Sequence, residues 1–379
     1  MQRVKKGKII MNRMRINQVL NDISDELNVP DSVLRKAITS YEGLGEYINN
    51  NTEYDVKIFP QGSIRLGTMI RPINDEDDYD IDLVCFVNKR VSSPKELKNI
   101  VGNVLKNSDR YSKLLDEEGR RCWTLKYADE AHFHMDVLPA KCGSNFDDEP
   151  IIITDKQNGA YSYQSSNPKG YAKWFDKKQK DGEKLHQYSI EKINTIGSKS
   201  TLQKGVQLLK RHRDIFYSTK DASSIEDKPI SIIITTVAAE LFDGNCTLID
   251  FIERVSNSWQ SCFTKDKKGN LILKNPVDDS ENFADKWIEH PNRKTAFIEW
   301  MDKLKKDLNE SNYAEFTNNI KEAEHLQMMF GRGIVMEAYK RHNVKNHNLF
   351  IDSSESALGI TTNTTKIPIK KHTFYGNGE

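Results

Sequence analysis

Residues 59–87 read FPQGSIRLGTMIRPINDEDDYDIDLVCFV, and this stretch decides the fold. It opens with a Gly-Ser turn at Gly62 and Ser63 and ends in an apolar strand that begins with the acidic pair Asp80 and Asp82. Successive side chains of a strand point to opposite faces, so these two carboxylates should share one face. A glycine turn lets backbone N–H groups and a hydroxyl approach a phosphate closely. The stretch therefore predicts a phosphate-binding turn beside a strand that carries two acids.

A third acid follows further along the chain, in the segment HFHMDVLPA that begins at His132. In a strand, His132, His134 and Asp136 would share one face. If this strand pairs with the strand of Asp80 and Asp82, three carboxylates meet, and they repel each other unless cations lie among them. Carboxylate oxygens are ligands that suit Mg²⁺, with Mn²⁺ as the alternative ion. We therefore expect these three acids to be the metal ligands and catalytic residues of a phosphoryl or nucleotidyl transfer.

Three residues of these segments also fit purely structural roles. Asp78 alternates with Asp80 and Asp82, but it ends a run of acids that is typical of a solvated loop. Asp136 could also be an exposed edge residue or the partner of a nearby arginine. For His134, a packed or surface histidine is the favoured interpretation over a role at the site.

The order and spacing of these motifs resemble the polymerase-β-like nucleotidyltransferases. More closely, they resemble the bacterial CD-NTases, relatives of animal cyclic GMP-AMP synthase that make cyclic oligonucleotide signals in CBASS antiphage defence. The resemblance extends from Phe59 to about Leu241. It implies that Asp136 is the family's third carboxylate, acting as general base or metal ligand toward the attacking hydroxyl.

A basic helix is predicted in the segment LQKGVQLLKRHRD, which begins at Leu202. Leu202, Val206 and Leu209 recur at helical spacing and should face the core. A basic helix is usually a solvated face, but the family carries a similar helix whose lysine reaches the nucleotide triphosphate. The resemblance implies that Lys210 has this role, with Lys204 as a second candidate.

The segment KPISIIITT predicts a further helix, with Ser231 at the N-cap position. The matching family segment places a serine hydroxyl and a helix N-terminus at the triphosphate, which is a favourable anion site. The resemblance therefore implies one nucleotide site formed by residues from several segments: Gln61, Gly62, Ser63, Lys204, Lys210 and Ser231.

Composition limits the class of protein. The chain has 379 residues. Its 56 Lys and Arg and 55 Asp and Glu give a net charge of +1, which argues against a protein dedicated to coating nucleic acid. The five cysteines form no C-x-x-C pair, so we expect free thiols in a reducing cytosol. For the same reason we expect no zinc ribbon of the type that binds DNA. With no long apolar run and no secretory signal, we expect a cytoplasmic protein that contacts no membrane.

Strands interleaved with helices predict an α/β (α+β) fold. The resemblance implies a polymerase-β-like nucleotidyltransferase lobe with a mixed sheet, a helical C-terminal lobe, and the active site in the cleft between them. Residues 1–190 would form the catalytic lobe, 191–350 the helical lobe that completes the nucleotide site, and 351–379 an extended or disordered tail. The resemblance implies that the predicted helices at 16–27 and 30–48 form a spine behind the sheet. Strands are expected at 55–59, 81–87, 122–127 and 133–138, a loop at 176–184, and further helices at 94–107, 199–217, 231–242, 282–308 and 313–339.

The resemblance implies an enzyme that joins NTPs, such as ATP or GTP, into a cyclic di- or trinucleotide and releases pyrophosphate at each step. A cyclic-nucleotide-responsive effector and CBASS accessory proteins would be its partners. Two alternatives stay open. One is a template-independent nucleotidyltransferase that acts on RNA ends or transfers AMP to a protein. The other is a nucleotide-binding module without catalysis.

Overall fold

The computed structural model describes residues 2–74, 78–88, 91–127, 133–143, 150–182, 199–310, 319–346, 349–352, 359–362 and 365–368. The first half of the chain forms α1 (Gln2–Glu26), α2 (Asp31–Asn50), β1 (Val56–Pro60), α3 (Gly62–Leu66), β2 (Tyr79–Val87), α4 (Pro94–Lys106), α5 (Tyr111–Leu114), β3 (Trp123–Tyr127), β4 (Phe133–Cys142), β5 (Ile151–Gln157), β6 (Ala160–Ser166) and α6 (Pro168–Gly182).

The second half is mainly helical. It forms α7 (Thr201–Ser218), α8 (Ala222–Glu226), α9 (Ser231–Leu241), α10 (Leu248–Ser258), the 3₁₀ turn Trp259–Cys262, β7 (Thr264–Lys265), β8 (Leu271–Ile272), β9 (Lys274–Asn275), β10 (Asp278–Asn282), α11 (Lys286–Glu289), α12 (Pro291–Glu310), α13 (Asn319–Phe330), α14 (Arg332–Asn346), β11 (Leu349–Asp352), β12 (Gly359–Thr362) and β13 (Thr365–Pro368). None of the described helices is long and apolar enough to cross a membrane.

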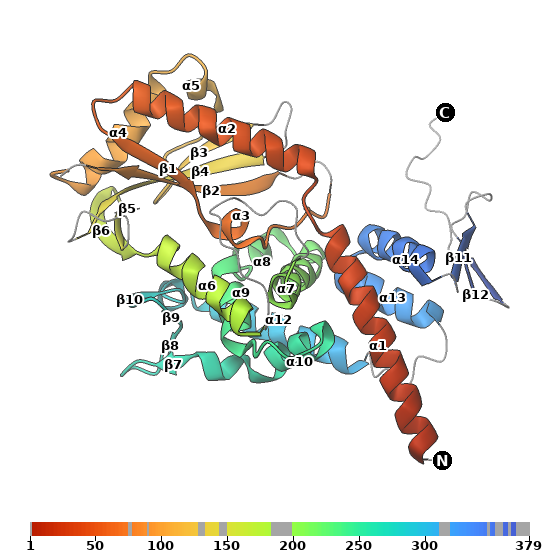
Figure 1. Ribbon diagram of the computed structural model, residues 1–379. Coiled ribbons are helices and arrows are strands. Elements are labelled where there is room, and N and C mark those ends of the chain that lie inside the picture. Colours follow the sequence, from red (N-terminus) through yellow and green to blue (C-terminus); the bar gives the residue numbers. More distant parts are fainter. Residues whose placement is uncertain are drawn as a thin grey trace.

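Six strands form one mixed sheet in the order β1-β2-β4-β5-β6, with β3 paired to β4. Only β2 and β4 run parallel among its described strand pairs. The alternating apolar residues Ile81, Leu83 and Cys85 pack into one core cluster with residues of α2 and α4, which cover that face of the sheet (Figure 1). The opposite face of β2 therefore carries Asp80 and Asp82. The predicted α+β fold with a mixed sheet is confirmed.

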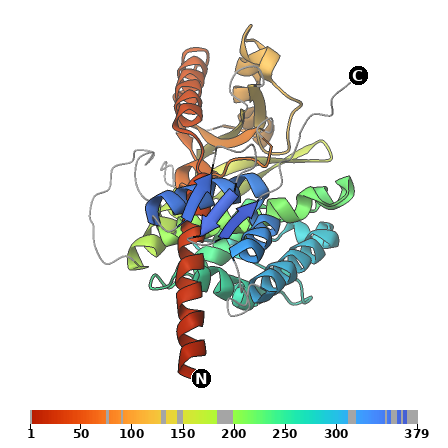
Figure 2. The ribbon, with the colours of Figure 1, turned by 90° about the vertical axis from the view of Figure 1, so that its right-hand side faces the viewer.

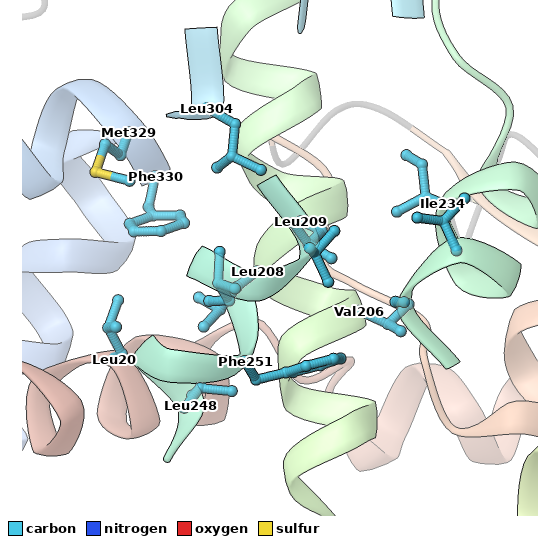
Figure 3. Packing of buried hydrophobic residues seen from close by; sticks show 14 of the residues in the cluster. Leu20, Val206, Leu208, Leu209, Ile234, Leu248, Phe251, Leu304, Met329 and Phe330 are labelled. Carbon is cyan, nitrogen blue, oxygen red and sulfur yellow. The ribbon is translucent and has the colours of Figure 1, made fainter. Parts of the chain in front are cut away.

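The helical part has a separate core around α7. Leu208 and Leu209 of this helix are fully buried, and Figure 3 shows them surrounded by apolar side chains from α1, α10, α12 and α13. Leu20 of α1 belongs to this cluster. The expected spine behind the sheet is therefore correct for α2 only. The apolar stripe of α1 faces the helical part instead, and the N-terminal end of α1 extends beyond that part in both views (Figures 1 and 2).

The predicted loop at 176–184 is wrong as far as residue 182, because α6 runs through it. Tyr171 and Phe175, in the first half of this helix, are buried. The charged residues that follow occupy its outer side, where Asp176 lies 3.0 Å from Arg65 and Lys178 lies 3.1 Å from Glu240. Lys and Asp on a solvated helix face give the same sequence pattern as a loop.

Two long helices were predicted where the structure has shorter elements. The expected helix at 282–308 is divided into the end of β10, α11 and α12, and Pro291 starts the last of these. The expected helix at 313–339 is divided at Gly331, whose φ of 90° ends α13 before α14 begins. Three short antiparallel strands, β11, β12 and β13, follow α14. The predicted domain boundary at residue 190 lies outside the described residues.

Candidate active site

The three predicted acids come together because β2 and β4 pair in parallel. In their register, Asp82 lies opposite Asp136 and Asp80 lies opposite His134. The condition under which the sequence analysis brings the three acids together, pairing of the two strands, is thus met. Burial raises the pKa of Asp82 to about 7, and the nearby carboxylates of Asp80 and Asp136 add to the shift. Thr124 of β3 donates a hydrogen bond to Asp136 Oδ1 at 2.5 Å and so orients that carboxylate.

His134 belongs to this cluster, contrary to the interpretation that favoured a packed or surface histidine. Its Nε2 pairs with Asp80 Oδ1, and its Nδ1 lies 3.8 Å from Asp78 Oδ2. The hydrogen bond with Asp80 raises the pKa of His134, against the effect of burial. Desolvation works to raise the pKa of Asp80, but His134 outweighs it and lowers that pKa overall. The side chain of Asp80 is 75% exposed, so it is the acid most open to a ligand. His132 lies outside the described residues.

The Gly-Ser turn forms the start of α3 and lies directly against Asp82. Gln61 is the N-cap residue of α3, and its backbone N–H donates to the carbonyl of Asp82 at 2.9 Å. Gly62 has a φ of 59°, and a Cβ at this position would overlap Asp82 Oδ2. Ser63 accepts a backbone hydrogen bond from Thr68 at 2.9 Å, which closes the short helix. Only glycine fits between this turn and the acidic strand.

One face of α7 binds the carbonyls of the loop that follows α3. Gln203 Nε2 donates to Leu66 at 2.9 Å, and Gln207 Nε2 donates to Met69 at 2.7 Å. Lys210 Nζ donates to the carbonyl of Thr68 at 3.1 Å. This contact holds Lys210 against the loop that follows the C-terminal end of α3.

Lys210 is buried beside other basic groups. Burial, with a smaller contribution from Arg213, lowers its pKa to about 7, although Asp214, Asp82 and Asp80 act in the opposite direction. Its amino group therefore interacts electrostatically with Asp80 and Asp82, the two acids of β2.

Lys204 lies on a different side of α7. Its Nζ is 3.0 Å from Asp25 and 3.1 Å from Asn21, both on α1. These contacts join α7 to α1 within the helical part. Of the two candidate lysines, the structure brings Lys210 and not Lys204 to the acids.

The expected N-cap at Ser231 is wrong. Ile230 is the N-cap residue, with an extended backbone, and Ser231 is the first residue of α9. Its hydroxyl accepts a hydrogen bond from Arg213 Nη1 at 3.2 Å, and the same guanidinium nitrogen donates to the carbonyl of Pro229 at 2.8 Å. Arg213 therefore holds the start of α9 on α7.

Lys228 is a basic residue near the site that sequence reasoning missed. Its Nζ lies 3.3 Å from Asp214 Oδ1, and its charge contributes to lowering the pKa of Asp80. Lys228 and Arg213 lie in segments already singled out in the sequence, but their position at the site depends on the packing of α7 against α9, which the local pattern does not show.

The residues present fit a divalent cation. Three carboxylates lie on neighbouring strands, and Asp80 and Asp136 add to the effect of burial in raising the pKa of Asp82. A divalent cation among the three carboxylates would offset their mutual repulsion. In the part of the chain that the structure describes, no three His, Cys, Asp or Glu side chains already stand in a geometry that could hold a metal.

Comparisons with known proteins agree with this geometry. Residues 14–179 match the model of the Second Messenger Oligonucleotide or Dinucleotide Synthetase (SMODS) domain. The chain is 28% identical to a c-di-GMP synthase of Roseivirga ehrenbergii over an alignment of 358 positions that covers 89% of this chain and 91% of the relative. It is 23% identical to the cyclic dinucleotide synthase CdnG of Bradyrhizobium diazoefficiens, covering 95% of this chain and 94% of CdnG.

Solved structures show the same fold. The structure of Bradyrhizobium diazoefficiens CdnG in complex with GTP matches with a TM-score of 0.67 at 21% identity, covering 86% of this chain and 99% of CdnG. Vibrio cholerae DncV, a cyclic AMP-GMP synthase solved with a linear intermediate, matches with a TM-score of 0.55 at 15% identity, covering 88% of this chain and 91% of DncV. The chain therefore has the fold of the CD-NTase nucleotidyltransferases and is similar to cyclic dinucleotide synthases over most of its length.

Proposed function

We propose that this enzyme joins two NTPs into a cyclic dinucleotide and releases one pyrophosphate for each bond formed. The observation that carries the proposal is the register of Asp82 opposite Asp136, beside a glycine turn, in a chain with the CD-NTase fold. The names of its relatives, a c-di-GMP synthase and CdnG, favour a dinucleotide over a trinucleotide. The GTP complex of CdnG favours GTP as the substrate.

In this proposal, Asp80, Asp82 and Asp136 hold Mg²⁺ or Mn²⁺. A bound divalent ion would lower the pKa of the attacking 3′ or 2′ hydroxyl and offset the charge of the leaving pyrophosphate. Asp136, fixed by the hydrogen bond from Thr124, would accept the proton of that hydroxyl or hold it in line for attack. His134 would keep Asp80 ionised, because it lowers the pKa of that carboxyl.

The triphosphate would lie between α3 and α9. We assign it to the turn of Gln61, Gly62 and Ser63, to Lys210, and to the hydroxyl of Ser231. This assignment is supported by the hydrogen bond from Lys210 to Thr68 at the base of α3. The contacts of Lys204 with α1 favour a structural role for that residue.

The family resemblance also suggests the role of the product in the cell. A cyclic dinucleotide released in the cytoplasm would act on an effector that responds to it, and accessory proteins of a CBASS system would control the synthase. One solved relative, CdnC of Escherichia coli, is a complex with a HORMA protein.

Product analysis tests the proposal. The purified protein is incubated with all four NTPs and Mg²⁺, treated with phosphatase, and analysed by mass spectrometry. We expect a phosphatase-resistant product with the mass of a cyclic dinucleotide. The double variant Asp80→Asn/Asp82→Asn should reduce its yield by several orders of magnitude, since about 10² or more per lost group is typical for electrostatic catalysis. Linear or RNA-attached products alone would contradict the proposal.

A further inference from the structure

Asp214 of α7 is shared by two basic side chains that come from different segments. Arg213 donates to Asp214 Oδ1 from Nε at 2.9 Å, and its Nη2 lies 2.8 Å from the same oxygen. Lys228, in the α8–α9 connection, donates to this oxygen from Nζ at 3.3 Å. The two cations carry one more positive charge than the carboxylate offsets. A further anion would therefore be stabilised beside this group.

The group lies at the proposed triphosphate site. Asp214 follows Lys210 by four residues, so the two side chains are neighbours on one side of α7. Arg213 Nη1 donates to the hydroxyl of Ser231 at 3.2 Å. Figure 1 shows α7, α8 and α9 together below α3. Lys228 thus joins Lys210 and Ser231 at one place, although a different segment of the chain carries it.

The buried donors at this place favour an anion with several oxygens. Lys210 donates to the carbonyl of Thr68 at 3.1 Å, and a carbonyl carries no full negative charge to offset the ammonium. Thr68 is itself fully buried, and its hydroxyl has no hydrogen-bond partner among the described residues. Buried charges and polar groups are costly unless they are paired. A phosphate group would supply both charge and acceptor oxygens here.

Lys228 is the cation of this group that can move. Its side chain is 38% exposed, and a partly exposed ion pair stabilises little because water competes with it. Arg213 is 8% exposed, and its guanidinium also donates to the carbonyl of Pro229 at 2.8 Å, so it is fixed on both sides. The charge of Lys228 already acts on Asp80. Its ammonium, on a flexible four-carbon stem, therefore lies within electrostatic range of the catalytic acids.

We propose that Lys228 binds the pyrophosphate that leaves the reaction, and that Asp214 takes Lys228 back when the pyrophosphate departs. The inference rests on the proposed function and adds a binding residue and a release step to it. As the attacking hydroxyl oxygen bonds to the α-phosphorus, the bond from that phosphorus to the bridging oxygen breaks, and its electron pair stays on the pyrophosphate. The ammonium of Lys228 offsets this charge. Asp214 and the pyrophosphate then compete for one ammonium.

Equilibrium binding of pyrophosphate in the presence of Mg²⁺ tests the exchange without requiring turnover. Calorimetric titrations compare the wild type with Lys228→Gln and Asp214→Asn. Lys228→Gln removes the ammonium and should raise the Kd for pyrophosphate about tenfold, the lower end of the range for a charge-assisted hydrogen bond. Asp214→Asn keeps an oxygen for Arg213 but no charge for Lys228, so the Kd should fall about two- to fivefold, the range of a partly exposed ion pair.

The opposite signs distinguish exchange from a purely structural ion pair. If the pair only fastened the α8–α9 connection to α7, loss of either partner would weaken binding or leave it unchanged. Lys220→Gln is the matched control, because it removes the same charge from an exposed lysine that follows α7. Lys220 Nζ lies 4.7 Å from the ring centroid of Phe216, and the variant should bind pyrophosphate like the wild type.

Three results would overturn the inference while the wild type still forms a cyclic dinucleotide, so that the proposed function stands. They are a wild type that does not bind pyrophosphate, an unchanged Kd in Lys228→Gln, and weaker binding in Asp214→Asn. Equal losses of affinity in Lys228→Gln and Lys220→Gln would also overturn it, because they would show a general effect of charge. A wild type that binds pyrophosphate but forms no cyclic product would contradict the proposed function instead.

Discussion

Gly62 lies so close to Asp82 that the two positions cannot both carry a side chain. A Cβ on Gly62 would overlap Asp82 Oδ2 and stand 3.0 Å from its Cγ. The backbone of Gly62 also has a φ of 59°, a conformation that favours glycine. The turn that is proposed to bind phosphate and the strand that carries the acids are therefore fitted to each other at this contact.

The first prediction concerns Gly62→Ala. The left-handed backbone should cost about 1–2 kcal/mol of stability, and the added methyl group should displace the Asp82 carboxylate. A displacement of about 1 Å in an active site can reduce the rate about 10²-fold, so we expect a loss of that order in pyrophosphate release with GTP.

Gly159→Ala is the control for this variant. Gly159 has a φ of 80° in the β5–β6 turn, and a Cβ added there would meet nothing within 4 Å, so the variant carries backbone strain without a clash. Its activity should stay near that of the wild type. Equal losses of activity in the two variants would contradict a specific role of the Gly62–Asp82 contact.

A second prediction separates the two lysines of α7. Lys210→Gln removes a buried amino group at the base of α3, and we expect the KM for GTP to rise about 10- to 100-fold, as for one charge-assisted hydrogen bond to phosphate. Lys204→Gln should leave the KM nearly unchanged, because its contacts are with Asp25 and Asn21 of α1. Steady-state kinetics with both variants measures the difference. A larger effect of Lys204→Gln than of Lys210→Gln would reverse our assignment.

A third prediction concerns pH and the core of the helical part. His212 is buried, and its Nδ1 accepts a hydrogen bond from Trp300 Nε1 at 3.0 Å while its Nε2 lies 2.9 Å from Asp307 Oδ2. This pattern suits the neutral ring, with Nε2–H as the donor to Asp307. Burial lowers the pKa of His212 below its usual 6.5, against the effect of Asp307.

The sign of the effect follows from proton binding. Below about pH 6.5 the unfolded chain takes up a proton at His212 that the folded chain does not, so unfolding becomes easier as the pH falls. The free energy of unfolding should therefore decrease between pH 7 and 5, by up to about 1.4 kcal/mol per pH unit from this group. Denaturant titrations of His212→Gln should show a weaker pH dependence. The exposed control His290→Gln should keep the wild-type dependence, and a steeper slope in His212→Gln would contradict the prediction.

The acids were predictable because their spacing alone fixes their face. In a strand, Asp80 and Asp82 must point the same way, and the alternation in the segment of Asp136 sets its face in the same manner. The three acids then meet on the condition that the two strands are neighbours, and β2 and β4 are.

Other features depend on tertiary packing that no local pattern reports. His134 has its role because the register places it opposite Asp80, and Lys228 because α9 packs on α7. The charged half of α6 resembled a loop, since only its first turns are buried. The apolar stripe of α1 does not indicate what this helix packs against, because the stripe would fit either the sheet or the helical part.

The central claim is that the acids on β2 and β4 carry out nucleotidyl transfer, and one comparison of rates tests it most directly. The rate of pyrophosphate release from GTP in the presence of Mg²⁺ is measured for the wild type, Asp136→Asn and Asp78→Asn. Asp78 precedes β2 and lies 3.8 Å from His134, so it is a neighbouring acid outside the proposed metal ligands.

We expect Asp136→Asn to lower the rate by about 10³-fold or more, since it removes a ligand and proton acceptor. Asp78→Asn should stay within a few-fold of the wild type. A near-normal rate in Asp136→Asn, with a folded protein, would contradict the account.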